Sequence, residues 1–396
     1  MGESLKKTKD IVFTKAKRAE VFFIYNVLVF FGGKSPEREI SIITGLLTLN
    51  SVSKEEYNAI PVYVHSNGSF YTGEQLKNVN YYKNFTEKDL QILTFKPGEP
   101  TVILKKGRKS KRVEVYTAIL CMHGRGGEDG TLAGLLRLCE IPFVGPDVFS
   151  SALAIDKDFT KIVLNGLGVE NVEYLRISRE NFFNKSNAFI KYASKKIGYP
   201  MIIKPARLGS SIGIKKIKAE SELFAGLCEA FNYDDKIICE KFIEGARDIN
   251  CAVYKLKNKF YVSLPEEAFH KSEILSFADK YGGGDKAVGN SREVANLKKE
   301  KTNEIKSLAK KIYRKLDFSS IVRFDFLVTE EKIYLNEINA IPGSLAYYLF
   351  CSKLSEFSAL LTELIKESKD RKRKEDNYVT YYSSNVLSGD FSGVKK

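Results

Sequence analysis

Short apolar runs alternate with longer helical segments along the first third of the chain. Runs typical of buried strands occupy residues 26–33, 59–64, 117–123 and 141–145. Because strands separated by helices form βαβ units, this pattern predicts an α/β unit with a largely parallel sheet up to about Pro146. Ligands would then bind at the carboxyl ends of its strands.

Two further strand-like runs, IVRFDF and YLNEIN, flank a turn at residues 329–332. Side chains two positions apart on a strand point to the same face, so Glu337 and Asn339 share a face, and the turn brings Asp325 back against them. Two carboxylates and an amide oxygen are ligands that Mg²⁺ prefers beside nucleotide phosphates. A hairpin with an exposed polar face is the alternative that this pattern leaves open.

Composition narrows the class of protein. A chain of 396 residues with 43% apolar content is long enough for a large core and suggests two or three compact units. The 63 basic and 49 acidic residues give a formal charge of +14, which would attract anions such as nucleotides. The lysines are spread along the whole chain and no nucleic-acid-binding motif is recognisable, so we do not expect nucleic-acid binding as the main role.

Three further features give no candidate functional residues: the cysteines, the longest apolar run and the two ends of the chain. The six cysteines fall mostly in apolar runs without a C-x-x-C pair, which predicts reduced core residues in a cytoplasmic protein. Residues 21–31 are too few to span a bilayer, so no membrane association is expected and they are interpreted as the first buried strand. Residues 1–20 are predicted to be a flexible basic extension, and a polar tail is expected after about Lys369.

The first strand ends in FGGKSPEREIS, where the chain turns into a helix. Ser35 can cap this helix. Glu37 is consistent with either an acid that complements the helix dipole or a group that holds a substrate amine.

A later strand ends in the glycine-rich turn CMHGRGGEDG. The turn predicts a close backbone approach and an anion-binding nest, although Asp129 and Thr131 are also ordinary capping residues and His123 is consistent with a structural role. No G-K-[ST] follows, so the turn is not a P-loop.

The middle of the chain supplies candidate phosphate ligands. Lys157 begins a helix, and Lys204 lies in the buried run MIIKP, where an unpaired ammonium would cost much desolvation energy, so we expect a counter-anion. Ser210 and Ser211 lie in GSSIG, which is either a flap that closes over phosphates or a simple turn. The strand that ends at residues 240–243 is suited to line an adenine site.

Taken together and in this order, GGKSPEREIS, HGRGGEDGTLAGLL, SALAIDKDFTK, IIKPARLGSSIGI, EKFIEG, VRFDF and LNEINAIPG resemble the ATP-grasp D-alanine:D-alanine ligases of bacterial cell-wall synthesis. The resemblance spans residues 26–350. It implies α/β and α+β architecture, with an N-terminal α/β domain followed by a two-subdomain ATP-grasp fold. The corresponding segments are an extension at 1–20, an N-terminal domain at 21–146, a central subdomain at 147–240, a C-terminal subdomain at 241–369 and a tail at 370–396.

The resemblance also implies roles for matching positions. Two Mg²⁺ (or Mn²⁺) ions would be held by Asp325, Glu337 and Asn339. Contacts to ATP would come from Lys157, Lys204, Ser210, Ser211, Glu240, Lys241, Phe242, Ile243, Asp248 and Lys280. Of these, Asp248 departs from the family pattern, since an extra residue precedes it and Asp replaces Glu. Catalysis, and closure of the active-site loop over the first amino acid, would involve Glu37, Ser210, Tyr281, Arg323 and Gly343. For Glu37, the resemblance favours the role of binding the substrate amine over the helix cap.

The implied reaction joins two D-alanines through an acyl phosphate made with ATP, and the implied partners are D-alanine and ATP, with a homodimer as a further expectation. The second-substrate positions are Ser344, Tyr348 and Leu349, and Tyr348 replaces a serine that the family commonly has. D-lactate, D-serine or another acceptor is therefore the alternative. A non-catalytic ATP-binding regulator would usually lack a metal ligand or a phosphate-binding lysine, and this chain keeps both.

Overall fold

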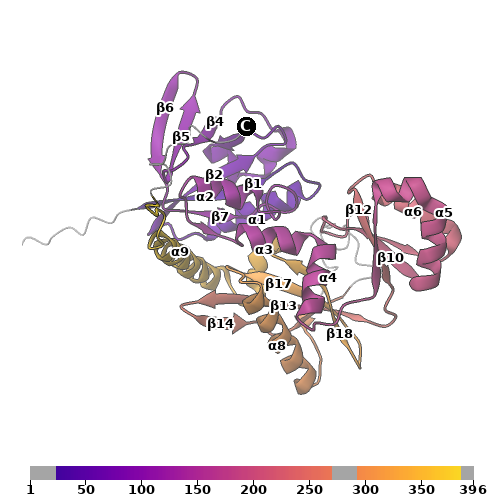
Figure 1. Ribbon diagram of the computed structural model, residues 1–396. Coiled ribbons are helices and arrows are strands. Elements are labelled where there is room, and N and C mark those ends of the chain that lie inside the picture. The colour runs from indigo at the N-terminus through magenta and orange to yellow at the C-terminus, as the bar shows by residue number, and fades with distance from the viewer. Residues whose placement is uncertain (1–23, 270–291, 385–396) are drawn as a thin grey trace, which may run out of the picture.

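The computed structural model describes residues 24–269 and 292–384. Within these ranges the chain forms three β-sheets, one after another along the sequence, each packed against helices (Figure 1). The expected site residues Lys280 and Tyr281 lie outside the described residues. The order of a mixed sheet followed by two antiparallel sheets confirms the expected fold class.

The first sheet contains the βαβ part that the sequence predicts. Its parallel strands are adjacent in the order β2-β1-β7-β8. The central strand is a continuous apolar run rather than an alternating one because both of its faces are covered, and Val27 to Phe31 are fully buried. The elements are β1 (Tyr25–Gly32), α1 (Arg38–Ser51), β2 (Tyr57–Val64), β7 (Thr117–Leu120), α2 (Thr131–Leu138) and β8 (Phe143–Val144).

The other half of this sheet is antiparallel, so the expectation of a largely parallel sheet is wrong. The links β2–β3, β4–β5 and β5–β6 are short, with a hairpin of β5 and β6 around residues 107–108, whereas η1 and η2 lie between β3 and β4. The added elements are β3 (Phe70–Thr72), η1 (Glu74–Lys77), η2 (Val79–Asn84), β4 (Gln91–Phe95), β5 (Thr101–Lys106) and β6 (Lys109–Glu114).

The second sheet is a separate antiparallel layer in the order β11-β10-β12-β9, with α5 and α6 against it (Figure 1). Its apolar core includes Ile203 and Ile237 and is distinct from the other two cores. The elements are β9 (Tyr174–Ser178), α5 (Arg179–Lys196), β10 (Met201–Pro205), β11 (Lys215–Ile217), α6 (Glu220–Ala230) and β12 (Lys236–Lys241).

The third sheet is also antiparallel, in the order β16-β15-β13-β17-β18 with β14 beside β13. Helices α3 and α4 precede the second sheet in the sequence, yet Leu153 and Leu164 from these helices belong to the core of the third sheet. The elements are α3 (Val148–Ile155), α4 (Lys157–Gly166), β13 (Arg247–Leu256), β14 (Lys259–Val262), β15 (Glu266–Ala268), β16 (Arg292–Val294), α8 (Lys299–Lys315), β17 (Val322–Val328), β18 (Ile333–Asn339) and η3 (Gly343–Leu349).

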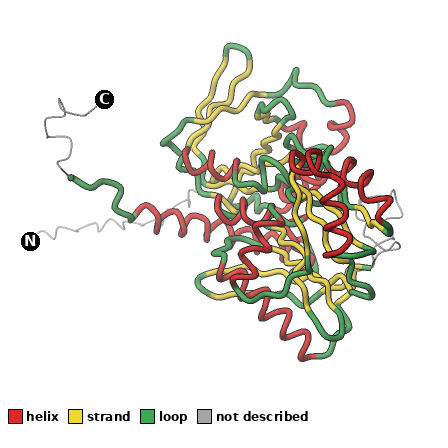
Figure 2. The backbone as a smooth tube through the Cα atoms, turned by 45° about the vertical axis from the view of Figure 1, so that its right-hand side comes forward, coloured by secondary structure: helices red, strands yellow, loops and turns green. Residues whose placement is uncertain are grey.

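Helix α9 (Leu354–Asp376) returns to the first sheet. Phe357 and Leu361 join the first core, the hydroxyls of Ser368 and Thr117 lie 2.8 Å apart, and Arg371 donates to the carbonyl of Phe143 at 2.6 Å. With these contacts the chain stays helical past residue 370, as far as Asp376. Figure 2 shows the end of α9 projecting from the body of the protein toward the C-terminus.

Cysteine pairing and helix length describe the chain further. All six cysteines lie in the described ranges, and none of them forms a disulfide there. Among the described residues, no helix combines the length and the apolar character needed to cross a bilayer.

Candidate active site

A cavity of about 450 Å³ lies where loops of the first sheet meet the second and third sheets. It collects side chains that are far apart in the sequence. The sequence-predicted residues in its lining are Glu37, Lys204, Ser210, Ser211, Glu240, Lys241, Phe242, Ile243, Asp248, Arg323, Asp325, Glu337, Asn339 and Gly343.

The expected hairpin of β17 and β18 forms one wall of this cavity. Asp325 is paired with Glu337, and Arg323 with Asn339, so these four side chains share one face. Because this face lines the cavity and Asp325 is largely buried, the alternative of an exposed polar hairpin is wrong.

Asp325 is held by its neighbours on the hairpin. The Arg323 guanidinium donates to both carboxylate oxygens, from Nε to Oδ1 and from Nη2 to Oδ2, each at 2.7 Å. Asn339 Nδ2 donates to Oδ2 at 2.9 Å. Burial alone would lower the pKa of Arg323, but the charge of Asp325 outweighs it and raises this pKa well above its usual range. The guanidinium therefore stays positive inside the cavity.

The oxygen donors of this wall suit a hard divalent cation. Asp325 and Glu337 supply carboxylates on one face, and Asn339, whose amide nitrogen faces Asp325, has its amide oxygen left for another partner. Two carboxylates and an amide oxygen match the ligand preference of Mg²⁺ and Mn²⁺. The donor set thus fits the metal that the sequence suggested.

Lys204 has the counter-anion that its burial requires. Its Nζ lies 2.6 Å from Glu240 Oε2 and donates to Asn336 Oδ1 at 2.9 Å. Burial alone would raise the pKa of Glu240, but the charges of Lys161 and Lys204 outweigh burial and lower it. The carboxylate of Glu240 therefore faces lysines, whereas the following residues, Lys241 to Ile243, continue along the cavity.

Lys157 reaches the same group of side chains from α4. Its Nζ donates to the carbonyl of Leu208 at 2.6 Å and lies 3.7 Å from Glu337 Oε2. Lys161, one turn later on the same helix, contacts Glu240 and was missed by sequence analysis. The i, i+4 spacing of the two lysines in KDFTK is the signal that could have found it.

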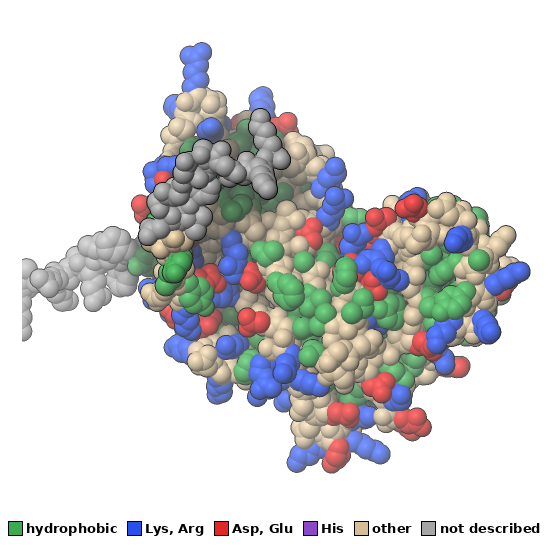
Figure 3. Space-filling model, in the orientation of Figure 1, with side chains coloured by type: hydrophobic (Ala, Val, Ile, Leu, Met, Phe, Trp, Pro, Cys, Tyr) green, Lys and Arg blue, Asp and Glu red, His purple; other side chains and the backbone are tan. Residues whose placement is uncertain are grey.

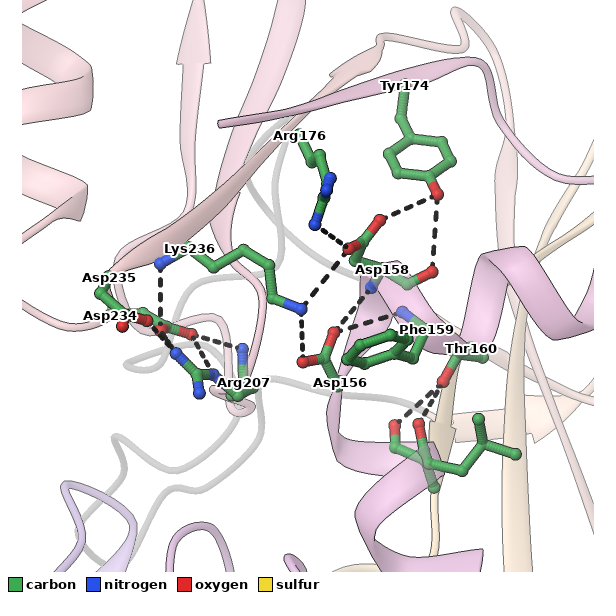
Figure 4. Close-up of polar contacts among 12 residues, drawn as sticks. Asp156, Asp158, Phe159, Thr160, Tyr174, Arg176, Arg207, Asp234, Asp235 and Lys236 are labelled. Atoms are coloured by element: carbon green, nitrogen blue, oxygen red, sulfur yellow. Dashed lines mark hydrogen bonds and ion pairs between the residues drawn. The ribbon is translucent and has the colours of Figure 1, made fainter. Parts of the chain in front are cut away.

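The start of α4 is anchored to the second sheet by ion pairs (Figure 4). Asp156 and Asp158 flank Lys157, and their Oδ2 atoms lie 2.6 and 3.4 Å from the Nζ of Lys236 on β12. Asp156 also caps α4, because its Oδ1 accepts from the backbone amides of residues 158 and 159. The backbone of Lys157 is therefore fixed relative to β12.

Glu37 does not cap α1, although it occupies the N-cap position. Its Oε1 accepts a hydrogen bond from Ser210 Oγ at 2.5 Å, and its buried Oε2 has no hydrogen-bond partner among the described residues. Burial raises the pKa of Glu37, while the Ser210 hydrogen bond opposes the increase. The cap interpretation is thus wrong, and a buried carboxylate oxygen is left to face the cavity.

The glycine-rich turn approaches Glu37 closely, as its composition predicts. A Cβ on Gly124, whose φ is +71°, would lie 2.7 Å from Glu37 Oε2. The amides of the turn are used internally, since Gly124 donates to Glu128 Oε2 and Gly126 to Asp129 Oδ2, each at 2.8 Å. These two amides are bound within the turn and do not form an open anion nest, and Asp129 Oδ1 also accepts from the amide of Thr131 at 3.0 Å.

Two titratable groups of this turn, Glu128 and His123, have shifted pKa values. Glu128, which sequence analysis missed, also accepts from the amide of Ile341 at 3.3 Å, and burial together with the charge of Glu37 raises its pKa to about 8. The sequence signal that could have identified Glu128 is an acidic residue within a glycine-rich turn that follows a strand. Burial lowers the pKa of His123 to about 4, and its Nε2 lies 3.0 Å from Thr44 Oγ1, consistent with the structural interpretation.

Two of the three expected second-substrate residues share a cavity, and the third does not. Ser344 and Tyr348 line a neighbouring cavity of about 420 Å³, which shares Arg323 and Gly343 with the first cavity. Arg323 Nη1 donates to the Tyr348 hydroxyl at 3.3 Å. Leu349 instead packs against the first apolar core.

Known proteins and sequence-family models match this chain over most of its length. Sequence models described as "D-ala D-ala ligase N-terminus" and "D-ala D-ala ligase C-terminus" match residues 26–146 and 163–367. The D-alanine–D-alanine ligase of Thermosipho melanesiensis is 37% identical over 367 residues, which is 91% of this chain and 98% of that protein.

Solved structures agree with the sequence matches. The D-alanine–D-alanine ligase of Helicobacter pylori superposes with a TM-score of 0.72 at 31% identity, covering 87% of this chain and 98% of that one. The VanG D-Ala:D-Ser ligase of Enterococcus faecalis gives a TM-score of 0.70 at 26% identity, covering 88% and 100%. The chain therefore belongs to the D-alanine–D-alanine ligase family.

Proposed function

We propose that this protein joins two D-alanine molecules into D-alanyl-D-alanine for peptidoglycan synthesis, converting ATP to ADP and phosphate. The supporting observation is that one cavity contains Glu37, a buried acid with an oxygen that has no hydrogen bond within the described part of the chain, a hairpin face with carboxylate and amide oxygens, and the buried ammonium of Lys204. An amine, a divalent cation and phosphates are the charged groups that such a lining would bind together.

In the proposed first step, the carboxylate of the first D-alanine attacks the γ-phosphorus of ATP, which forms an acyl phosphate and releases ADP. Glu37 would hold the ammonium of this D-alanine, and Ser210 would hold Glu37. Lys157 and Lys204 would position the phosphates, since phosphoryl transfer depends mainly on positioning and charge neutralisation. Asp325, Glu337 and Asn339 would hold Mg²⁺ or Mn²⁺, which supplies charge neutralisation for the transferring phosphoryl group.

In the proposed second step, the neutral amine of the second D-alanine attacks the acyl carbon, and the C–O bond to phosphate then breaks, with the proton that the amine loses leaving on the phosphate. The tetrahedral intermediate carries an oxyanion, and Arg323, which stays positive, would stabilise it together with the amide of Gly343. The strand from Lys241 to Ile243 would line the adenine, and Asp248 would face the ribose. These two assignments rest on the family match and on their place in the cavity lining.

A different acceptor is the second candidate, because Tyr348 occupies the position of an expected serine and contacts Arg323. The VanG relative is named as a D-Ala:D-Ser ligase, so acceptor choice differs among proteins of this fold. Incubating the purified enzyme with ATP, D-alanine and D-serine or D-lactate, followed by mass analysis of the products, identifies the acceptor.

We further propose that the protein acts in the cytoplasm as a homodimer. Figure 3 shows apolar side chains gathered over α3 and α4, where Phe149, Phe159 and Ile162 are more than half exposed. A contiguous exposed apolar patch of this kind favours a protein partner. Light scattering on the eluted peak of a size-exclusion column measures the oligomeric state.

The function itself is tested by phosphate release from ATP. We expect release that requires both Mg²⁺ and D-alanine, with D-alanyl-D-alanine as the product and no stimulation by L-alanine. A folded protein that releases no phosphate with any D-amino acid contradicts the ligase function.

A further inference from the structure

Helix α4 and strands β10 and β12 meet at a buried cluster of two lysines and one glutamate. Lys161, Lys204 and Glu240 are 2%, 4% and 3% exposed, so water screens their charges only weakly. The Nζ atoms of Lys161 and Lys204 lie 2.8 and 2.6 Å from different oxygens of the Glu240 carboxylate. A single carboxylate thus faces two ammonium groups, and the cluster has a net charge of +1.

The two lysines differ in what else they contact. Lys204 lines the cavity and donates to Asn336, whereas Lys161 is not part of the cavity lining. The contact of Lys161 with Glu240 is close but poorly aligned for a hydrogen bond, so its contribution is chiefly one of charge. Lys161 therefore affects the charge of the cavity lining indirectly, through its contact with Glu240.

We propose that Lys161 is a positioning residue for ATP: by compensating Glu240, it leaves the positive charge of Lys204 available to the nucleotide phosphates. This inference rests on the proposed function, in which Lys204 binds those phosphates.

The reason is electrostatic. With Lys161 in place, the Glu240 carboxylate is shared, and the cluster attracts anions. Without Lys161, the remaining pair of Lys204 and Glu240 is neutral, and Lys204 would have to leave this carboxylate to approach a phosphate. Loss of Lys161 should therefore weaken the binding of the phosphates and leave the binding of the adenosine part of the ligand unchanged.

The test compares Lys161→Met with the double variant Lys161→Met/Glu240→Gln. Methionine keeps the unbranched shape of the side chain and removes its charge, and the second change restores the net charge of +1 by removing the carboxylate. Lys332→Met, which removes a half-exposed lysine paired with Glu170, is the control for loss of one positive charge elsewhere. Calorimetric titration measures the Kd values of MgATP and of adenosine, which has no phosphates, and thermal unfolding identifies misfolded samples.

We expect Lys161→Met to raise the Kd of MgATP by about 10- to 100-fold, with the Kd of adenosine and that of the Lys332→Met control unchanged. The double variant should recover at least part of this loss. A purely structural role of Lys161 predicts instead that adenosine binding weakens in parallel and that the second substitution adds further damage. Either of those results would overturn this inference but not the proposed function. The same holds if Lys161→Met binds MgATP with wild-type affinity.

A wild-type protein that binds no MgATP overturns the proposed function and this inference together. If Lys161→Met does not fold, Lys161→Gln takes its place: it should raise the Kd of MgATP about 10- to 100-fold and leave that of adenosine unchanged, and a parallel loss of adenosine binding contradicts the charge argument.

Discussion

Replacing Ser210 with alanine removes the hydrogen bond that links the loop of the second sheet to Glu37 of the first. The two residues are 173 positions apart, and the Ser210 Oγ to Glu37 Oε1 distance is 2.5 Å. A hydrogen bond to a charged group contributes about 1.5–3 kcal/mol, and Glu37 is too buried for water to replace it. Since each 1.4 kcal/mol is a factor of ten, we expect kcat/KM for the first D-alanine to fall about 10- to 100-fold.

The assay measures initial rates of phosphate release against D-alanine concentration at saturating MgATP. Ser319→Ala is the matched control, because its hydroxyl also donates one hydrogen bond, to the carbonyl of Gly145 at 2.7 Å, but lies outside the cavity lining. The control should keep wild-type kinetics. A Ser210→Ala enzyme with kcat/KM for D-alanine within about threefold of wild type would show that the contact contributes little to substrate binding.

Three further predictions follow from individual side chains. Glu337→Gln should lower phosphate release by about 100-fold or more, whereas Glu331→Gln in the exposed turn should not; equal rates would remove Glu337 from the metal site. Tyr348→Phe should raise the KM of the acceptor about 5- to 10-fold and leave that of ATP unchanged, and an unchanged acceptor KM would contradict this role. For His123, the pKa of about 4 in the folded state lies below the usual 6.5, so the unfolded state binds the proton first as pH falls. Wild type should therefore lose roughly 3 kcal/mol between pH 7 and pH 4 that His123→Asn does not lose, measured by urea unfolding.

Much of the site chemistry follows from local sequence. Asp325 and Glu337 lie on the same face of the hairpin because side chains alternate along a strand and one short turn joins the two strands. Both features can be predicted from the amino-acid sequence. The need of Lys204 for a counter-anion also follows from its apolar neighbours. The antiparallel half of the first sheet was not predicted, because strand direction there depends on how successive strands pair rather than on their composition.

The identity of interaction partners depended on the fold. Glu240 compensates Lys204 because β10 and β12 pair in a register that brings these side chains to one region of the sheet, and Lys161 joins them because α4 packs across it. The sequence by itself determined which residue types could bind a metal, phosphates and an amine. Only the tertiary structure decided that Ser210 holds Glu37 and that Arg323 holds Asp325 beside Tyr348, because contacts between distant residues are set by strand register and packing, which no local pattern encodes.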